Sequence, residues 1–427
     1  MGRGGQKQAA VGTTPEPSEV LYDGRFIDVS SLKHPGGNVI KFYQGNGIDA
    51  TQAFDNFHIR SKIAAKYMKS LPSRDADMKK LDKTRLAGQP ALLKDFNQLT
   101  RDLQAEGFFD PAPLHVFFRV LELLVIHAVG ALMLFNAHSE YQLPIALAGT
   151  ALMGLGSGRC GWLMHEGGHY SLTGHIPTDR ALQIVIYGVG CGMSGSWWRS
   201  QHNKHHSMPQ KVGHDVDLNT LPLVAFTTKV VKNVGSKMKS WISLQAILFP
   251  VITTFLVSSG WQLFLHPRHI LRRKNLPEAT AVFTRYALWH HFITGHFGLT
   301  TSAAIYVMYN WCASNYIFIN FAVSHTHLPV VAKEDTEVDW VRYAAIHTMN
   351  VNPGPFNFVD WWMSYLNYQI EHHLWPSMPQ FRHPETSLRV QAIFKKHGLH
   401  YDTRDYVESV NATFKNLHNV GMDVFYG

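Results

Sequence analysis

Long apolar runs separated by polar stretches dominate most of the chain. The first two runs cover 114–135 and 143–164. A helix needs about 20 apolar residues to cross the hydrocarbon core of a bilayer, so each run is long enough to span it. Two such runs in tandem, with aromatic residues at their ends, predict a membrane hairpin. Three further runs follow, over 241–265, 281–298 and 302–323.

The placement of charge favours one arrangement of these later runs. The segment 266–275 carries four basic side chains, and the positive-inside rule keeps such a loop in the cytosol. The histidine clusters described below can meet only if they lie on the same side of the membrane. The chain must therefore cross the membrane an even number of times between the second and third clusters. We therefore expect 281–298 and 302–323 to form a second hairpin. The run 241–265 then lies flat or re-enters, which leaves about four transmembrane helices.

The chain before the apolar runs divides into a tail and a small domain. Residues 1–18 are rich in Gly, Pro and Thr, have no apolar core and predict a disordered tail rather than a secretory signal. The stretch VLYDGRFIDV predicts two short strands that turn at Asp23 and Gly24. We place the boundaries of this domain at 19–72.

A polar segment then joins this domain to the rest of the chain. Residues 73–91 are charged and predict a linker. The stretch 92–109 has apolar residues at helical spacing, which predicts a solvated or interfacial amphipathic helix. We expect a single membrane domain over 92–427.

Composition narrows the class of protein. The 427 residues are 12% aromatic and carry a formal charge of +8, which suits a membrane surface, since no nucleic-acid-binding module is present. The three cysteines, Cys160, Cys191 and Cys312, are far apart in apolar stretches and predict buried small side chains, not disulfides. No glycine-rich motif for binding a dinucleotide occurs between a predicted strand and a predicted helix. Any reductase that uses a nicotinamide cofactor would therefore be a separate protein.

Three clusters of histidine, here called the histidine boxes, carry the candidate chemistry. HEGGH contains His165 and His169, and its letters match a zinc-peptidase pattern. WWRSQHNKHH and LNYQIEHH place side chains at i, i+3 and i+4, which puts them on one face of a helix. The residues in these two boxes are His202, His205, His206, Gln369, His372 and His373.

The number of histidines argues against a peptidase. A catalytic zinc site needs three protein ligands and one open position. Seven clustered histidines exceed that number, and two iron ions with open positions for O2 fit them better. Two adjacent glycines inside HEGGH would also cost a peptidase helix about 1 kcal/mol each. Glu166, Asp215 and Asp217 are candidate acceptors for histidine N–H groups behind the metal ligands.

Two further histidines predict a haem site in the small domain. His34 precedes Pro-Gly-Gly, which lets the backbone approach a flat ligand, and His58 follows in a Phe-rich segment. Two imidazoles on opposed loops can clamp a porphyrin from both faces. HPGG, DATQAF and FH at this separation resemble cytochrome b5, which implies that His34 and His58 are axial haem ligands. The leader is shorter than in that family, which leaves the edge strands in doubt.

From Val20 to about Asn416 the chain resembles the front-end fatty-acid desaturases that are fused to cytochrome b5. The resemblance rests on HPGG, the three boxes, Gln369 at the start of the last box, and stretches such as RCGWLMHEGGHYSLTG and NFAVSHTHLP. It is most similar to the delta-5 desaturases of microalgae and protists. The implied fold is a small α+β haem domain fused to an all-α membrane domain with a cytosolic di-iron cap.

The resemblance also implies cofactors, partners and one more ligand. Electrons would pass from NADH through cytochrome b5 reductase to the b-type haem and then to two non-haem iron ions, with O2 as co-substrate. The enzyme would lie in the endoplasmic reticulum membrane, with its haem domain and boxes in the cytosol. The family pattern implies a ligand in SHTH, for which we predict His327, with His325 as the alternative. Gln369 would bind iron through its carbonyl or leave an opening.

The expected reaction is insertion of a cis double bond on the carboxyl side of an existing one. The favoured substrates are C20 acyl chains, on phospholipid or CoA, with conversion of dihomo-gamma-linolenate to arachidonate and of eicosatetraenoate to eicosapentaenoate. The alternatives are delta-6 desaturation of C18 chains, sphingolipid delta-8 desaturation or hydroxylation, and a haem-binding membrane electron carrier without di-iron chemistry. A zinc peptidase is the remaining alternative, and it would need Glu166 as its general base.

Overall fold

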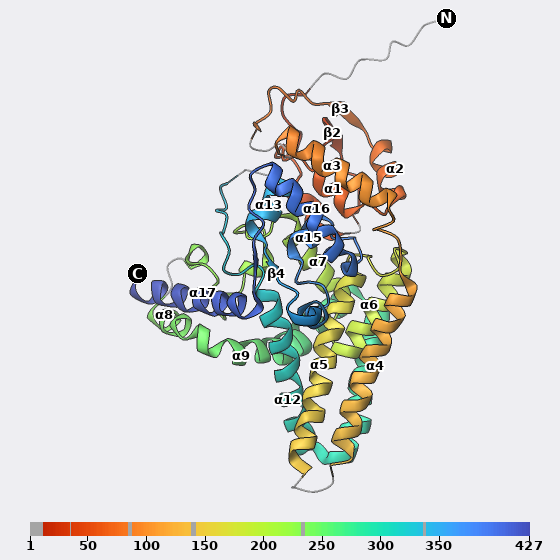
Figure 1. The fold of residues 1–427 in the computed structure, drawn as a ribbon, viewed down its shortest axis with the longest axis vertical. Coiled ribbons are helices and arrows are strands. Elements are labelled where there is room, and N and C mark those ends of the chain that lie inside the picture. The colour runs from red at the N-terminus through yellow and green to blue at the C-terminus, as the bar shows by residue number, and fades with distance from the viewer. Residues whose placement is uncertain (1–11, 35, 84–87, 138–141, 232–234, 336–338) are drawn as a thin grey trace, which may run out of the picture.

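The fold is described from a computed structural model of the whole chain (Figure 1). The described residues are all except 1–11, 35, 84–87, 138–141, 232–234 and 336–338. A small N-terminal module lies at one end of the molecule and a long helical bundle at the other. Between them lies a cap, which contains the chain's short helices.

The N-terminal module begins with the predicted hairpin. β1 (Glu19–Tyr22) pairs antiparallel with β2 (Arg25–Asp28). The turn residues Asp23 and Gly24 both have positive φ, 49° and 71°, which suits a two-residue hairpin loop. The helices η1 (Gly37–Phe42), α1 (Thr51–Phe57) and α2 (Lys62–Ser70) follow. The strand and turn predictions for this region are confirmed.

The boundaries of this module extend beyond those predicted on both sides. β3 (Ser73–Asp75), which falls at the start of the predicted linker, pairs antiparallel with β2. Gly12, from the predicted tail, bridges to Ala76. The cause is Arg74, whose guanidinium lies 2.6 Å from the Glu19 carboxylate and also donates to the carbonyl of Thr14. Residues 1–11 of the predicted tail lie outside the described residues.

The predicted amphipathic helix forms as α3 (Pro90–Ala105), but its apolar face is covered by protein. Leu92, Phe96, Leu99 and Leu103 are buried in the same core as residues of α13 (Trp340–His347) and α16 (His383–Lys396). Phe96 also stacks on Trp375 at 5.1 Å. The helix is therefore a structural tie between the N-terminal module and the cap, rather than an interfacial helix.

Five helices make up most of the bundle. They are α4 (Pro113–Phe135), α5 (Leu143–Gly168), α6 (Ile176–Cys191), α11 (Leu276–Leu288) and α12 (Gly295–Ala322). The helices α4 and α5 form the predicted hairpin, and they approach closely where glycine faces glycine. A Cβ on Gly130 would lie 2.7 Å from the carbonyl oxygen of Gly149. Small residues at such contacts are typical of helix packing in membranes.

Two helical runs in the described part are long and apolar enough to cross a membrane. They are α4 and the continuous run Gln245–Arg273. This second run joins α9 (Gln245–Phe255), the π-helical η6 (Leu256–Leu265) and α10 (His266–Arg273). Its first part, α9, lies across the bundle beside α8 (Ser236–Ser243) and α17 (Tyr406–Tyr426) (Figure 1). The number of crossings therefore stays a prediction.

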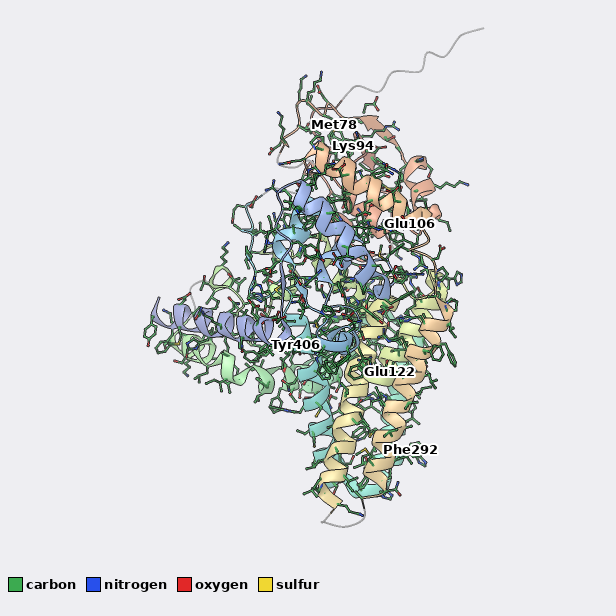
Figure 2. The ribbon with its side chains drawn as sticks, in the orientation of Figure 1. Met78, Lys94, Glu106, Glu122, Phe292 and Tyr406 are labelled. Carbon is green, nitrogen blue, oxygen red and sulfur yellow. The ribbon has the colours of Figure 1, made fainter. Side chains whose placement is uncertain are left out.

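Side-chain positions agree with this division of the molecule. Phe292 lies near the far end of the bundle, whereas Lys94 and Glu106 lie at the opposite end, near the N-terminal module (Figure 2). Glu122 lies on α4 between these two ends.

One buried charge pair ties the bundle to the cap. Arg159 on α5 is only 2% exposed, and its guanidinium donates to both carboxylate oxygens of Glu122 at 2.8 and 3.0 Å. It also donates to the carbonyl of Trp361, in α14 (Phe358–Trp362), at 2.8 Å. A buried charge is costly unless paired, so this geometry fixes α14 against α4 and α5.

The cap contains the remaining elements. They are α7 (Gly195–Ser207), η4 (Val216–Leu218), η5 (Thr228–Val230), η8 (Pro355–Asn357), α15 (Gln369–Leu374) and η9 (Gln380–Arg382), together with a parallel pair of short strands, β4 (Asn350–Val351) and β5 (Thr403–Arg404). The helices α7 and α15 carry the second and third histidine boxes.

Candidate metal centre

The three histidine boxes meet at one place, where the bundle joins the cap. His165 lies in the last turn of α5, and His169 is the residue that ends this helix. The second box lies on α7, which begins at Ser194, whose hydroxyl accepts from the backbone N–H of Trp197 at 3.1 Å. The third box forms α15. Segments about 200 residues apart in the sequence are thus brought together.

The histidines form two groups, each compact enough to hold a metal ion. The first group contains His165, His169, His202, His206 and His372. The second contains His205, His325 and His373. Within each group the nitrogens that could bind a metal all lie within 4.8 Å of one another. The groups are adjacent, since the rings of His206 and His373 stack at 4.2 Å.

The protonation of these rings suits metal binding. Both nitrogens of His372 and His373 are buried without a hydrogen-bond partner, as are Nε2 of His169 and Nδ1 of His206. Burial and neighbouring histidines lower the pKa of His372 and of His373 well below the usual range. These imidazoles are therefore neutral, which is the form that binds a transition metal. Orphaned buried nitrogens of this kind fit a metal-bound state.

In SHTH the structure brings the alternative ligand, His325, and not His327, to the histidine groups. His325, the alternative, joins the second group, where its Nδ1 donates to the carbonyl of His347 at 3.1 Å. His327 lies outside both groups, with its Nε2 3.3 Å from the guanidinium of Arg404. The helix α12 ends at Ala322, and the turns that follow direct residue 325 inward and residue 327 away.

Gln369 lies where the pattern of the third box places it. It is the first residue of α15, and its Oε1 lies 3.2 Å from Nε2 of His325. Its side chain is buried, as the side chains of the second group are. Because Nδ1 of His325 donates to His347, Nε2 of the neutral ring carries no hydrogen, and both this nitrogen and the Gln369 oxygen are free to approach an ion in the second group.

Two of the predicted acceptors contact a box histidine directly. Both oxygens of Asp215 lie 3.1 Å from Nδ1 of His205, and the same carboxylate accepts from the backbone N–H of Gln210 and Asp217. Asp217 approaches the same Nδ1 at 3.2 Å, with a side chain that is 63% exposed. Burial lowers the pKa of His205, but the two carboxylates outweigh it and raise that pKa to about 9. Nδ1 is thus the donor to the carboxylates, and a metal ion in the second group would have to displace the proton on Nε2.

Glu166 reaches a histidine only through another residue. With its amide oxygen facing His165, Gln380 accepts from Nδ1 of that ring at 2.8 Å. Its amide nitrogen then donates to Glu166 and to the carbonyl of Ser364, both at 3.0 Å. The carboxylate of Glu166 also lies 3.6 Å from the Arg119 guanidinium. Sequence reasoning missed Gln380, because no motif marks a residue that acts only through a tertiary contact.

The glycines of HEGGH have a packing role. A Cβ on Gly168 would lie 2.3 Å from the Trp198 ring and 2.8 Å from the amide nitrogen of Gln183. These contacts bring α5 against α6 and α7, and α7 carries the second box. Glycine at position 168 therefore sets the close approach of the first box to the second.

A cavity of about 680 Å³ reaches both groups of histidines. His165, His202, His205 and His325 form part of its wall near the boxes. Its other walls come mainly from apolar side chains of α5, α6, η6, α9 and α12. Binding sites for small molecules commonly have about 300 to 1,000 Å³, so this volume suits a large apolar ligand.

The two histidines of the predicted haem site face each other in the N-terminal module. Their ring centroids are 6.1 Å apart. Nδ1 of His58 donates to the carbonyl of Phe54 at 2.9 Å, which leaves Nε2 available, and Nδ1 of His34 is buried without a partner. Burial and the neighbouring His58 lower the pKa of His34 to about 4. These neutral, opposed imidazoles with an aromatic wall, where Phe54 stacks on His58 at 4.4 Å, fit two axial ligands of a haem.

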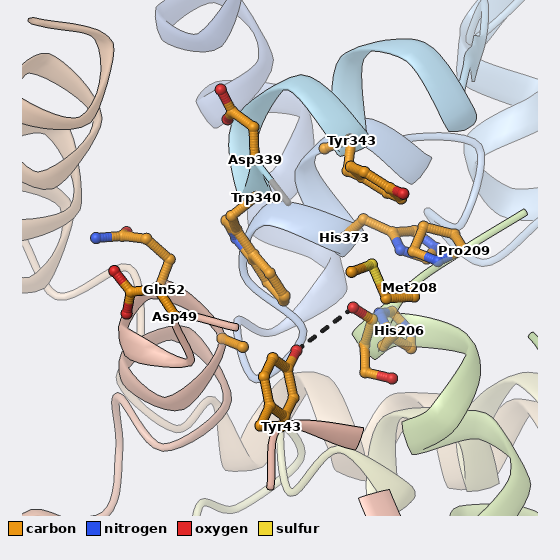
Figure 3. A pocket seen from close by; sticks show the side chains of 13 residues that line it. Tyr43, Asp49, Gln52, His206, Met208, Pro209, Asp339, Trp340, Tyr343 and His373 are labelled. Carbon is orange, nitrogen blue, oxygen red and sulfur yellow. Dashed lines mark hydrogen bonds between the residues drawn. The ribbon is translucent and has the colours of Figure 1, made fainter. Parts of the chain in front are cut away.

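The N-terminal module packs directly over the histidine groups. Figure 3 shows Tyr43 beside Trp340, His206 and His373 at a small pocket, which Gln52 also lines. The Tyr43 hydroxyl donates to the carbonyl of Ser207 at 3.5 Å. Phe57, next to His58 in the chain, lies 6.1 Å from the ring of His206. The two predicted cofactor sites are therefore neighbours.

These observations define a class. A helical bundle with apolar outer faces holds two groups of buried histidines beside a long apolar cavity, as in a membrane enzyme that binds metal and acts on an apolar chain. The sequence profile named Fatty acid desaturase matches residues 142–405. The chain belongs to the fatty acid desaturase family and is a desaturase, an oxidoreductase.

Individual relatives are similar over almost the whole chain. A protein of Rebecca salina named acyl-lipid (8-3)-desaturase is 50% identical over 408 residues, which cover 95% of this chain and 92% of the relative. One of the same name from a Thraustochytrium species is 44% identical, covering 99% and 98%. A protein of Euglena gracilis named delta(8)-fatty-acid desaturase is 29% identical, covering 86% and 87%.

Proposed function

We propose that the protein is an O2-dependent front-end acyl desaturase, which inserts a cis double bond between an existing one and the carboxyl end. The observation that carries this proposal is the position of the histidine groups at the wall of a cavity large enough for an acyl chain. Removal of two hydrogens from a methylene chain needs a metal beside the chain and exclusion of water, and a mainly apolar cavity with candidate metal ligands in its wall supports both requirements.

The proposed metal centre contains two iron ions. His165, His169, His202, His206 and His372 would hold one, and His205, His325 and His373 the other. Iron bound there would supply the activation of O2, whose two atoms would leave as water with the two hydrogens taken from the chain, two external electrons and two protons. The residues of the chain orient the ligands. Asp215 fixes the tautomer of His205, Gln380 holds His165, and Gln369 approaches the second group.

The proposed electron entry is a b-type haem between His34 and His58. The cytochrome b5-like character of the N-terminal module rests on these opposed imidazoles and on its contact with the second box. Electrons would come from NADH through a separate cytochrome b5 reductase. We propose a location in the endoplasmic reticulum membrane with the cap in the cytosol. The apolar runs and the basic segment 266–275 support that orientation.

The position of the new double bond has two candidates. The sequence led us to expect delta-5 desaturation of C20 chains whose first double bond is at carbon 8. The Euglena gracilis relative is named for delta-8 itself, which supports delta-8 as the second candidate. We propose the reaction for which the Rebecca salina and Thraustochytrium relatives are named, acyl-lipid (8-3)-desaturation, and the position of the new double bond in the product distinguishes delta-5 from delta-8.

Feeding experiments in yeast test both the reaction and its position. Cells that express the full chain receive separately a C20 acid with its first double bond at carbon 8, a C20 acid with its first at carbon 11, and a C18 acid. Delta-5 desaturation converts the first acid, delta-8 the second, and delta-6 the third. A His372→Ala, His373→Ala double variant is the matched control. No new double bond with any acid, together with haem iron but no non-haem iron in the purified protein, would establish the electron carrier instead.

A further inference from the structure

The cavity wall has a polar region at the end near the second box. Gln201, Lys204, Asp217, Asn219 and Thr220 line it there, and the side chains of Asp217 and Asn219 are exposed. The remaining wall, between α6, η6 and α12, is mainly apolar, with Trp197 and Trp261 packed at 5.8 Å. A long chain with one polar end would therefore bind in a single direction.

Lys204 stands out in this polar region. It is the only Lys or Arg among the described residues that line the cavity. Asp215 and Asp217, the two carboxylates that also line the cavity, lie against Nδ1 of His205 instead. Among the described residues no acceptor or carboxylate is paired with the Lys204 ammonium. A cation that faces a cavity without a protein partner is suited to an anionic or carbonyl oxygen of a ligand.

The position of Lys204 on α7 relates it to the metal groups. It lies between His202, of the first group, and His205, of the second. Its side chain lines the same cavity as His202 and His205, so an oxygen held by its ammonium would lie in the cavity that reaches both groups. Because the reacting carbon of a front-end desaturase is counted from the carboxyl group, such a contact would set which carbon reaches the metal.

The polar region also lies next to the helices that cross the bundle. Trp241 on α8 donates to the carbonyl of Leu223 at 3.0 Å, and Gln245 on α9 exchanges two hydrogen bonds with Ala225 at 2.8 and 2.9 Å. On the same helix Ile247 is 80% exposed. An apolar exposed helix lying across the bundle is typical of a membrane interface. The segment that lines the polar region is therefore held by hydrogen bonds against these two helices.

We propose that Lys204 binds the oxygens at the carboxyl end of the acyl substrate and so determines the position of the new double bond. This inference rests on the proposed function. The ligand is an acyl chain whose carboxyl group is linked to a phosphate-bearing carrier, either a phospholipid or CoA. Lys204 is a specificity-determining residue. Its ammonium holds the carboxyl end of the substrate before, during and after the removal of hydrogen.

The test compares Lys204→Met, which keeps the length of the side chain without its charge, with Lys204→Arg, which keeps the charge. Lys237→Met, on the exposed part of α8, controls for general loss of positive charge. The full chain in lipid nanodiscs is assayed for KM, kcat and the position of the new double bond. A charge-assisted contact of this kind corresponds to about a ten- to hundredfold effect. We expect KM to rise by that factor in Lys204→Met, with a second positional isomer among the products.

Three further measurements make the result decisive. Non-haem iron should be unchanged in Lys204→Met, because the residue is not a ligand, and Lys204→Arg and Lys237→Met should keep one product. Equilibrium binding without O2, with acyl-phospholipid and with acyl-CoA in separate arms, identifies the carrier as the one whose binding weakens. An unchanged KM with a single product, or unchanged binding in both arms, overturns the proposal. Wild-type protein that makes no double bond at all would instead overturn the proposed function.

Discussion

Replacement of Asp215 by Asn tests the role of the carboxylates behind the histidines. The two oxygens of Asp215 serve three donors, Nδ1 of His205 and the backbone N–H groups of Gln210 and Asp217, at 2.7 to 3.1 Å. Asn offers one oxygen, so its NH2 must face one of the two backbone N–H groups. An unsatisfied buried donor costs about 1 to 3 kcal/mol of the free energy of unfolding. Loss of such an acceptor behind a metal ligand typically lowers metal affinity about 10- to 100-fold.

The assay measures non-haem iron that remains in the purified protein after dialysis against a chelator of graded concentration. For Asp215→Asn the chelator concentration that removes half the iron should fall by about one to two orders of magnitude, while the haem absorption stays unchanged. The matched control is Asp217→Asn, which contacts the same nitrogen but is 63% exposed, so that water replaces most of what is lost. Equal retention of iron in Asp215→Asn and wild type would refute the reasoning, as would a larger loss in Asp217→Asn.

The other predictions concern ligands and packing. His325→Ala should lose non-haem iron and desaturation, whereas His327→Ala should keep both; the reverse result would restore the ligand predicted from the sequence. Gly168→Ala forces a methyl group against an indole ring 2.3 Å away, and such overpacking lowers the free energy of unfolding by about 1 to 3 kcal/mol. Thermal unfolding of this variant in detergent should therefore begin at a lower temperature than that of the control Gly235→Ala, where the added methyl group has nothing within 4 Å. His34→Ala should abolish the haem absorption and leave non-haem iron unchanged; loss of both would show that the two sites fold together.

Local pattern predicted the elements of this protein well. The apolar runs at 114–135 and 143–164 became α4 and α5, and Asp23 and Gly24 formed the expected turn. Within the second and third boxes, helical spacing places the histidines on one face of α7 and of α15, as expected. In each case the controlling interaction lies within a few residues along the chain, and the sequence displays it directly.

Predictions failed where a distant segment decides the outcome. The ring of His325 is directed inward because its Nδ1 donates to the carbonyl of His347. The sequence SHTH does not reveal the turns after α12 that make this contact possible. Gln380 was missed for the same reason, since its contact with His165 joins residues 215 positions apart. The amphipathic spacing of 92–109 identified the helix but not its partner, because an apolar stripe fits a protein core as well as a membrane surface.

The histidine groups lie between the long cavity and the N-terminal module. On one side lies the long cavity, lined by His165, His202, His205 and His325. On the other lies the N-terminal module, which meets His206 and His373. The acyl chain would thus approach the metal centre from the cavity. Electrons would approach it from the N-terminal module, on the opposite side, so the two routes would not cross. Evolution could then reshape one approach, to change the chain that is accepted, while the other stays as it is.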